Sequence, residues 1–271
     1  TFYFRSGKKC CCTVICGHSS FYWIVSRWAD ENGFERKRNF MIQISNLSKK
    51  YGETVVFSDL NYTFENACIY GLVGRNGAGK TTLLNILSNY DKNYTGVISI
   101  DGEKMNKVDY LDMPVAYAMD QPSFFNELTI YENLLLIASS RKIKKQEAFD
   151  KIERILDGLG LKKYENYSPL ELSKGTMQRL NNACAMIQEE KITIFDEPFS
   201  GLDPVQMKLL ENVIVEFHKK EKGIYIISSH DIECLQNVCD KCLLLHNGQI
   251  REINTEEVDR EKIAKILSEG E

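Results

Sequence analysis

The spacing of apolar residues changes along the chain, and each pattern predicts a different kind of structure. Early in the chain, residues 42–47 (IQISNL) and 55–64 (VVFSDLNYTF) place apolar residues mainly at alternate positions. A period of two indicates strands with one face in the core and the other in solvent. These two segments therefore predict a small antiparallel sheet.

Later segments are shorter and more uniformly apolar, as expected of strands that are covered on both faces. The clearest are KITIF at residues 191–195 and IYIISS at residues 224–229. Residues from about 128 to 186 have a mostly helical period. Further strands are predicted at residues 68–73, 97–101 and 115–119, and a hairpin at residues 243–253 with Asn247 and Gly248 at its turn.

This order predicts an α/β fold with a mostly parallel sheet, an N-terminal antiparallel β subdomain and a helical insertion subdomain at about residues 122–186. In open α/β sheets, ligands bind beyond the carboxyl ends of the strands. Residues that directly follow the predicted strands are therefore the first candidates for a functional site.

Composition narrows the possible functions. The chain has 271 residues and a formal net charge of −4, which gives no support to nucleic-acid binding. No apolar run approaches the roughly 20 residues that cross a bilayer, so a membrane role requires a partner. Of the nine cysteines, the five scattered ones are expected to be free thiols, buried where their surroundings are apolar. The CCCxxxC cluster at residues 10–16 is an alternative zinc site, but it lacks two separated ligand pairs.

The first 40 residues do not share the pattern of the rest. They show no sustained period, and residues 35–38 (ERKR) can be encoded by purines alone, like a bacterial ribosome-binding site. We hypothesise that Met41 is the natural start and that residues 1–40 are upstream sequence read in frame. The alternative is a partner-binding arm, and N-terminal sequencing of the native protein distinguishes the two.

A glycine-rich loop lies between a predicted strand and a predicted helix. Its sequence, GRNGAGKTT, matches G-x-x-x-x-G-K-[ST], a phosphate cradle whose backbone N–H groups point inward. We expect Lys80 to reach the β- and γ-phosphates and Thr81 to hold Mg²⁺. The predicted nucleotide-binding residues of the loop are Gly74, Arg75, Asn76, Gly77, Ala78, Gly79, Lys80, Thr81 and Thr82. This motif predicts a P-loop NTPase core.

Polar side chains follow three of the predicted strands. Asp196 ends the strand KITIFD and is predicted to hold the metal, and Glu197 is predicted to polarise an attacking water. His230 follows IYIISS, and Gln121 follows VAYAM, where it is expected to contact the metal or the water.

Two short segments match guanine-nucleotide motifs by chance. DGLG, at residues 157–160, ends an amphipathic pattern at which Gly160 is a good helix C-cap. NKVD, at residues 106–109, lies in a polar loop and follows no buried strand of the late core.

Taken together, seven elements in order resemble the ATP-binding subunits of ABC transporters, from about Met41 to the C-terminal region. The resemblance adds three elements to those above: Tyr51, expected to stack on adenine; LSKGTMQR, similar to the signature usually written LSGGQ; and SGLD with Asp203, similar to the D-loop. In the signature, Ser173 and Gly175 are present, but Lys174 replaces a glycine and Thr176 a glutamine.

The resemblance implies a mechanism and partners. ATP and Mg²⁺ bind each of two paired copies, which form a homodimer or pair with a related ATPase subunit. The signature helix of one copy covers the nucleotide of the other, with Ser173 and Gly175 facing phosphate. Glu197 activates water, and His230 positions water and the γ-phosphate. Lys174 and Thr176 are expected to alter the rate more than the role.

It also implies a setting for the protein. We expect a separately encoded transmembrane permease, a peripheral location on the cytoplasmic side of the membrane, and a role in export, and we expect no nucleic-acid partner. Phe124 and Phe125 either contact the permease or pack inside the helical subdomain. The alternative function is a soluble ABC ATPase, such as an iron–sulfur assembly ATPase.

Overall fold

The structure is a computed structural model that describes residues 40–108, 113–230 and 232–253. The predictions for residues 1–39, which include four of the cysteines, lie outside the described residues. So does Asp109 of the NKVD segment.

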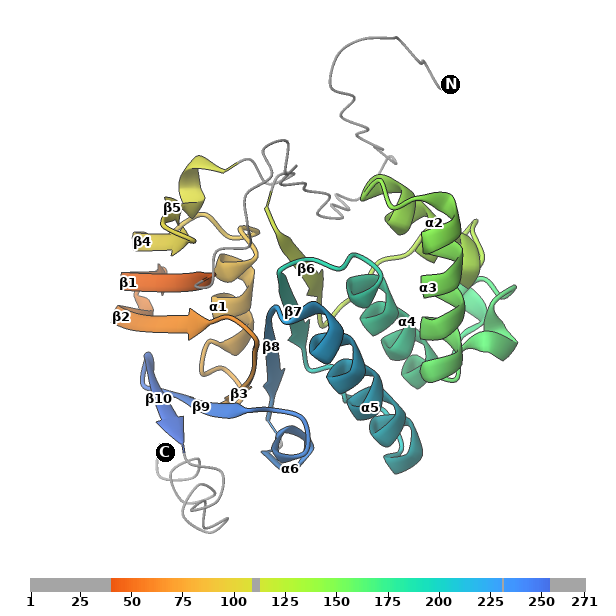
Figure 1. Ribbon diagram of the computed structural model, residues 1–271. Coiled ribbons are helices and arrows are strands. Elements are labelled where there is room, and N and C mark those ends of the chain that lie inside the picture. The colour runs from red at the N-terminus through yellow and green to blue at the C-terminus, as the bar shows by residue number, and fades with distance from the viewer. Residues whose placement is uncertain (1–39, 109–112, 231, 254–271) are drawn as a thin grey trace, which may run out of the picture.

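Ten strands and six α-helices make up most of the described chain (Figure 1). The strands are β1 (Met41–Tyr51), β2 (Thr54–Glu65), β3 (Cys68–Val73), β4 (Thr95–Ile100), β5 (Glu103–Lys104), β6 (Val115–Ala118), β7 (Ile192–Asp196), β8 (Ile224–Ser229), β9 (Lys241–His246) and β10 (Gln249–Ile253). The α-helices are α1 (Lys80–Leu87), α2 (Ile130–Ser140), α3 (Lys145–Gly158), α4 (Lys174–Met186), α5 (Pro204–Glu221) and α6 (Ile232–Gln236).

The strands form two sheets, as the sequence predicts. The smaller sheet is antiparallel with the order β2-β1-β4-β5, and the larger has the order β10-β9-β3-β8-β7-β6. In the larger sheet β3 pairs in parallel with β8 and β9, and β7 pairs in parallel with β6 and β8. The predicted α/β fold class is confirmed.

The burial of the strands follows their apolar patterns. In β1, Ile42 and Ile44 are buried whereas Gln43 between them is exposed, so one face of the small sheet meets solvent. Every residue of β7 and of β8 is buried, because the larger sheet is covered on both faces.

The hairpin between β9 and β10 also forms as predicted. Asn247 and Gly248 occupy its two-residue turn with φ of 47° and 72°. Positive φ at both central residues is the requirement of the type I′ turn, which suits the twist of the two strands.

Two apolar cores lie on either side of the larger sheet. In one core, α1 packs between the two sheets, and its leucines Leu83, Leu84 and Leu87 are fully or almost fully buried (Figure 1). In the other, α2 to α5 supply most of the buried side chains against the opposite face. Phe40, directly before β1, is buried in the first core, and Phe124 packs against the second.

Smaller sequence predictions have clear outcomes. Helix α3 ends at Gly158, and Gly160 follows with φ of +61°, a backbone conformation that glycine adopts easily. All five cysteines among the described residues are free thiols, and four of these are buried. Burial raises the pKa of Cys68 and of Cys242 to about 11, so neither is a ready thiolate.

Candidate nucleotide-binding site

The glycine-rich loop runs from the end of β3 to the start of α1. Gly79, the N-cap residue of α1, has φ of +99°, and a Cβ there would lie 2.6 Å from Val56, so only glycine fits. No side chain caps this helix, which leaves its first N–H groups available to an anion. These features are those of a phosphate cradle.

Lys80 is held inside this loop. Its side chain is almost buried, and its Nζ donates to the carbonyl oxygens of Gly74 at 2.8 Å and Arg75 at 3.4 Å. The Lys80 Nζ also lies 3.7 Å from Glu197 Oε1. The loop thus brings its lysine to the carboxyl end of β7.

Asp196 is the last residue of β7, and it is 1% exposed. Its Oδ1 accepts a hydrogen bond from Ser228 Oγ at 2.5 Å, and the hydroxyl of Thr81 also bonds this carboxyl. Its Oδ2 is buried and has no hydrogen-bond partner. Burial raises the pKa of Asp196, the Ser228 and Thr81 hydrogen bonds lower it, and nearby Asp120 and Glu197 raise it further.

Glu197 turns the chain sharply after β7. Its φ is +49°, a conformation that costs a non-glycine residue of order 1–3 kcal/mol. Its N–H donates to Ser228 Oγ at 2.9 Å, and its Oε2 lies 3.0 Å from His230 Nδ1. This turn directs the carboxylate between Lys80 and His230, whose side chain is 61% exposed.

The structure does not bring two of the predicted site residues, Tyr51 and Gln121, into contact with the acidic pair. The Tyr51 hydroxyl, at the end of β1, donates to Asp91 at 3.1 Å, and the Lys49 Nζ lies 4.5 Å from the centroid of the Tyr51 ring. Gln121 follows β6 at the same sheet edge as Asp196, but its side chain is exposed and no described hydrogen bond joins it to Asp196 or Glu197. Their roles remain predictions.

Ser228 is a site residue that the sequence analysis did not single out. It contacts both acidic residues, because β8 lies beside β7 with Ser228 in register with Asp196. The signal in the sequence was the pair of serines at the end of a buried strand, before His230. Only the strand order, which the sequence does not reveal, makes that pair neighbours of Asp196.

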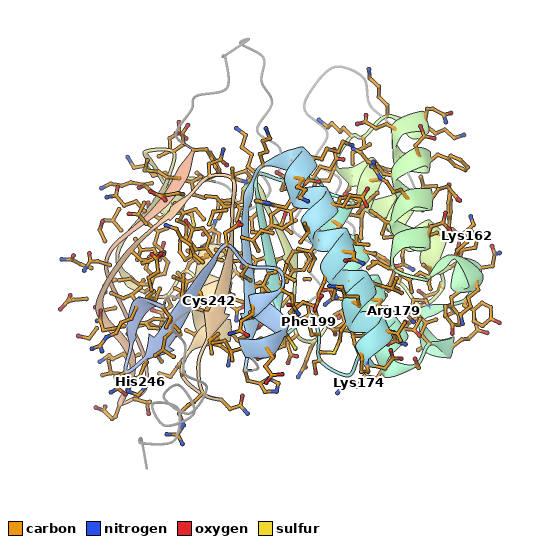
Figure 2. All side chains as sticks on the ribbon, turned by 60° about the horizontal axis from the view of Figure 1, so that its bottom comes forward. Lys162, Lys174, Arg179, Phe199, Cys242 and His246 are labelled. Carbon is orange, nitrogen blue, oxygen red and sulfur yellow. The ribbon has the colours of Figure 1, made fainter. Side chains whose placement is uncertain are left out.

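The signature segment begins helix α4. Ser173 is the N-cap residue, and its Oγ accepts from the N–H of Thr176 at 3.3 Å. A Cβ on Gly175 would lie 2.9 Å from Gly201 O, so glycine is needed for contact with the segment that contains Asp203. Asp203 caps α5 by accepting from the N–H of Gln206 at 2.9 Å. Lys174 is exposed at the lower rim of the molecule (Figure 2).

Helix α4 is fastened to the strand ends that carry the acidic residues. Gln178 Nε2 donates to Glu197 O at 3.3 Å, Asn182 Nδ2 to Pro198 O at 3.1 Å, and Asn181 Nδ2 to Met119 O at 2.7 Å. These three hydrogen bonds connect the helix of the signature segment to the segments that directly follow β6 and β7.

The residues at the end of β7 fit a magnesium ion. Mg²⁺ prefers hard oxygen ligands, and Asp196 presents a buried carboxylate oxygen without a hydrogen-bond partner beside the hydroxyl of Thr81. The neighbouring Asp120 and Glu197 add negative charge. A cation there would relieve the cost of burying this carboxylate.

A glycine-rich loop at a helix start, a lysine within it and an acidic pair at the end of a parallel strand of the same sheet together define a P-loop ATPase. Comparison with known proteins makes the class specific, because the family model described as ABC transporter matches residues 57–200. The chain belongs to the ABC transporter family. Within that family it is a subunit that binds and hydrolyses ATP.

Relatives of this chain carry different transport names. It is 32% identical over 208 residues to an uncharacterized ABC transporter ATP-binding protein of Methanocaldococcus jannaschii, over 77% of this chain and 75% of that protein. It is 30% identical to a tungstate uptake system ATP-binding protein of Peptoclostridium acidaminophilum, over 78% of this chain and 97% of that protein. It is also 30% identical to a bacitracin transport ATP-binding protein of Enterococcus faecalis, over 82% of this chain and 71% of that protein.

A solved structure supports the same fold. The ATP-binding subunit of an ABC transporter superposes with a TM-score of 0.73 and 28% identity, over 82% of this chain and 93% of that chain. Among the described residues, no helix combines the length and the apolar character needed to cross a membrane.

Proposed function

We propose that this subunit powers a transporter by closing on ATP with a second copy or a related subunit. The observation that carries the proposal is the convergence of Lys80 and His230 on Glu197, next to the buried, unpaired oxygen of Asp196. This arrangement provides phosphate binding, a metal ligand and a general base at one edge of the sheet.

The proposed roles of the residues follow from their positions. The loop from Gly74 to Thr82 binds the triphosphate, with Tyr51 against adenine. Thr81, Asp196 and Gln121 would hold Mg²⁺, and the bound ion would neutralise charge on the phosphates. Glu197 takes a proton from the attacking water, and His230, within hydrogen-bonding distance of Glu197, orients this carboxylate and the γ-phosphate.

The second copy completes the site in this proposal. Its Ser173 and Gly175, at the start of α4, and its Asp203 meet the bound triphosphate across the pair. The positive end of a helix dipole and the free N–H groups of a helix start stabilise the negative charge that develops there. One ATPase domain from residue 41 onward, with a helical subdomain at about residues 122–186, carries both surfaces.

The proposal also names a setting. We place the subunit on the cytoplasmic side of the cell membrane, bound to a separately encoded transmembrane permease through the segment after Gln121, where Phe124 and Phe125 are partly exposed. Export is the proposed direction, supported by the similarity of the LSKG segment to export cassettes. The tungstate uptake relative makes direction the part that most needs a transport assay.

ATP hydrolysis by the purified subunit with its permease tests the core of the proposal. Activity should require Mg²⁺ and rise more than linearly with subunit concentration, because two copies form each site. Ser173→Ala and Gly175→Asp should both depress the rate strongly. Equal activity per molecule in a form that cannot pair would contradict the shared site.

Cargo movement in inside-out membrane vesicles tests the direction. ATP added outside such vesicles drives an exporter to accumulate its cargo in the lumen. Recovery of the subunit with membranes only when the permease is expressed tests the partner, and recovery in the soluble fraction in both cases supports the soluble ATPase alternative.

A further inference from the structure

The start of helix α4 contains a hydrogen-bond chain that neither the family motif nor the N-cap role explains. The Ser173 Oγ, which accepts from the Thr176 N–H, also lies 2.9 Å from Thr176 Oγ1. Ser173 is exposed, whereas Thr176 is only 3% exposed. An outward-facing hydroxyl is thus in contact with an inward-facing one.

Arg179 lies at the inner end of this chain of contacts. Its Nη2 donates to Thr176 Oγ1 at 3.2 Å, and its Nη1 donates to the carbonyl oxygens of Leu159 at 2.7 Å and Gly160 at 3.2 Å. The side chain is buried, and Figure 2 shows it on the same side of the molecule as Lys174. The two carbonyls after α3 therefore fix the guanidinium, and the guanidinium fixes Thr176.

The direction of the Ser173–Thr176 bond follows from the available donors. A guanidinium only donates, so Thr176 Oγ1 is the acceptor of the Arg179 bond. If Ser173 also donated to Thr176, the proton of Thr176 would need another acceptor, and the bonds among the described residues offer none. If Thr176 donates to Ser173, the Thr176 proton has an acceptor while its oxygen accepts from Arg179.

This direction decides what Ser173 can do. A hydroxyl has one donor and two acceptor positions. Both acceptor positions of Ser173 are then filled by Thr176, one by its N–H and one by its O–H. Its own proton remains, on an exposed oxygen, and only an outside acceptor can take it.

We propose that Thr176, fixed by Arg179, is a positioning residue that orients the Ser173 hydroxyl as a donor toward the triphosphate held by the second copy. The inference rests on the proposed function, in which Ser173 meets phosphate. Where the usual signature has a glutamine amide, this chain thus has the buried hydroxyl of Thr176, which directs the Ser173 proton outward.

Two pairs of variants isolate this hydroxyl. Thr176→Val keeps the shape of the side chain and removes its oxygen, and the measurement is kcat and KM for ATP in the paired form. Thr176→Ser and Thr176→Ala both lose the methyl group and differ only in the hydroxyl. If the valine variant does not fold, the serine and alanine variants are compared with each other instead. All rates are normalised to the folded fraction.

We expect Thr176→Val to lower kcat about tenfold, the loss expected when one hydrogen bond to a charged group is weakened. Thr176→Ser should stay within about twofold of the parent, and Thr176→Ala should lose about as much as valine. ATP affinity of unpaired subunits should not change in any of them, because Thr176 does not line the phosphate cradle.

The decisive control repeats Thr176→Val in a Ser173→Ala background. Without the Ser173 hydroxyl, Thr176 has nothing to orient. Adding Thr176→Val to Ser173→Ala should therefore lower kcat by less than about twofold. The same tenfold loss in both backgrounds, or no difference between Thr176→Ser and Thr176→Ala, would overturn the inference. If Ser173→Ala alone leaves turnover unchanged, the proposed phosphate-binding role of the signature fails, which is a distinct result.

Discussion

The two ends of strand β7 carry similar acidic residues in opposite electrostatic surroundings. At the carboxyl end, the buried oxygen of Asp196 has no partner, and the acidic groups of Asp120 and Glu197 lie nearby. At the amino end, Arg141 pairs with Glu190 at 2.6 Å, and Lys151 pairs with Glu189 at 2.5 Å. Among the described residues, no lysine or arginine forms an ion pair with Asp196, whereas both glutamates at the amino end have one.

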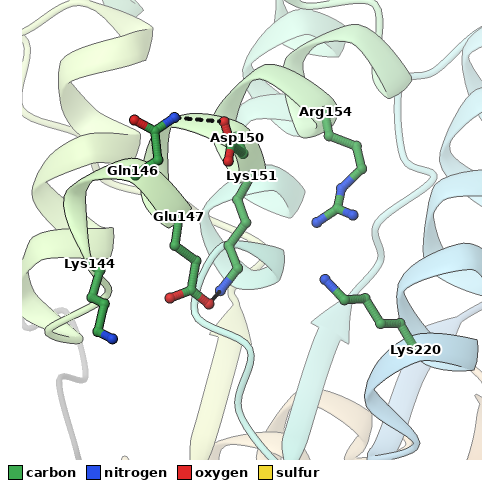
Figure 3. Close-up of a pocket in the computed structure, with 7 residues that line it drawn as sticks. All are labelled: Lys144, Gln146, Glu147, Asp150, Lys151, Arg154 and Lys220. Atoms are coloured by element: carbon green, nitrogen blue, oxygen red, sulfur yellow. Dashed lines mark hydrogen bonds and ion pairs between the residues drawn. The ribbon is translucent and has the colours of Figure 1, made fainter.

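The amino end is also the more basic surface. A hollow of about 480 Å³ is lined by side chains of α3, by Lys144 directly before that helix and by Lys220 near the end of α5 (Figure 3). Lys151 lies at its edge and also pairs with Glu147 at 3.0 Å. Lys151 and Lys220 both lie close to Glu189, with nitrogen–oxygen distances of 2.5 Å and 3.9 Å, so these two cations neutralise a carboxylate of the same chain.

The difference teaches how to separate a structural charge from a functional one. Burying a carboxylate is unfavourable unless a cation or hydrogen bonds compensate it. At the amino end, Arg141 and Lys151 of the same chain compensate the buried carboxylates. At the carboxyl end we propose that a bound cation and nucleotide supply the compensation, so substitutions there should change activity more than stability.

Glutamine substitutions at the two ends give the largest expected contrast. Glu197→Gln removes the proposed general base and should lower turnover about 1000-fold, within the range for loss of acid–base catalysis. The variant should still bind ATP and accumulate as a closed pair. Phosphate release measures the rate, and gel filtration with ATP and Mg²⁺ detects the pair.

Glu221→Gln is the matched control for that experiment. It makes the same chemical change at the far end of the sheet, where Glu221 accepts from the Tyr225 hydroxyl at 2.6 Å. Turnover should remain within about twofold of the parent, because Glu221 is far from the developing charge. Rapid hydrolysis by Glu197→Gln, or an equal loss in both variants, would contradict the contrast.

Arg141→Met should produce the largest loss of stability. The Arg141 guanidinium bonds Gln188 and Val115 O as well as Glu190, and its removal leaves a mostly buried carboxylate unpaired. Breaking such a pair costs about 3 kcal/mol, measured as the free energy of unfolding in urea. Lys80→Met is the comparison at the carboxyl end, where Glu197 keeps some contact with solvent.

Lys80→Met should abolish ATP binding while lowering stability by less than about 1 kcal/mol. An equal loss of stability in Arg141→Met and Lys80→Met would contradict the proposed difference between the two ends of β7.

The sequence predicted the carboxyl end of β7 far better than the amino end. Lys80, Asp196, Glu197 and His230 follow glycine-rich or apolar segments that identify them locally, and the structure brings these four together. Glu190 and Arg141 are 49 positions apart, and nothing in either segment indicates the other. Contacts of that kind depend on how helices pack, which a local period does not encode.

The signature segment shows the same limit on a smaller scale. The resemblance placed Ser173 in the signature helix, and the structure shows it as the N-cap residue of α4. The resemblance gave no sign that Thr176 would face inward toward Arg179, because that orientation depends on the two carbonyls after α3. The strained backbone of Glu197 was equally invisible, since no motif records a positive φ.

The pH dependence of stability gives the smallest expected effect. Burial, opposed by the Tyr225 hydrogen bond and aided by the charge of Glu189, raises the pKa of Glu221 to about 7. Burial likewise raises the pKa of Glu190 to about 7 against the opposing effect of Arg141. Between about pH 4.5 and pH 7, the folded chain therefore binds more protons at these two groups than the unfolded chain does. Their contribution to stability is fully present below that range and is lost as the pH rises through about 7.

Glu221→Gln tests this dependence, because glutamine keeps an acceptor for Tyr225 and carries no charge. The variant should gain about 1 kcal/mol over the parent at pH 8 and lose that advantage by pH 5. Urea unfolding at both pH values measures the difference, and Glu147→Gln serves as the control of opposite sign. Lys151 lowers the pKa of Glu147, so this second substitution should instead lower stability at pH 8. If the unfolding free energies of Glu221→Gln and Glu147→Gln change equally between pH 5 and pH 8, Glu221 does not titrate in the folded protein.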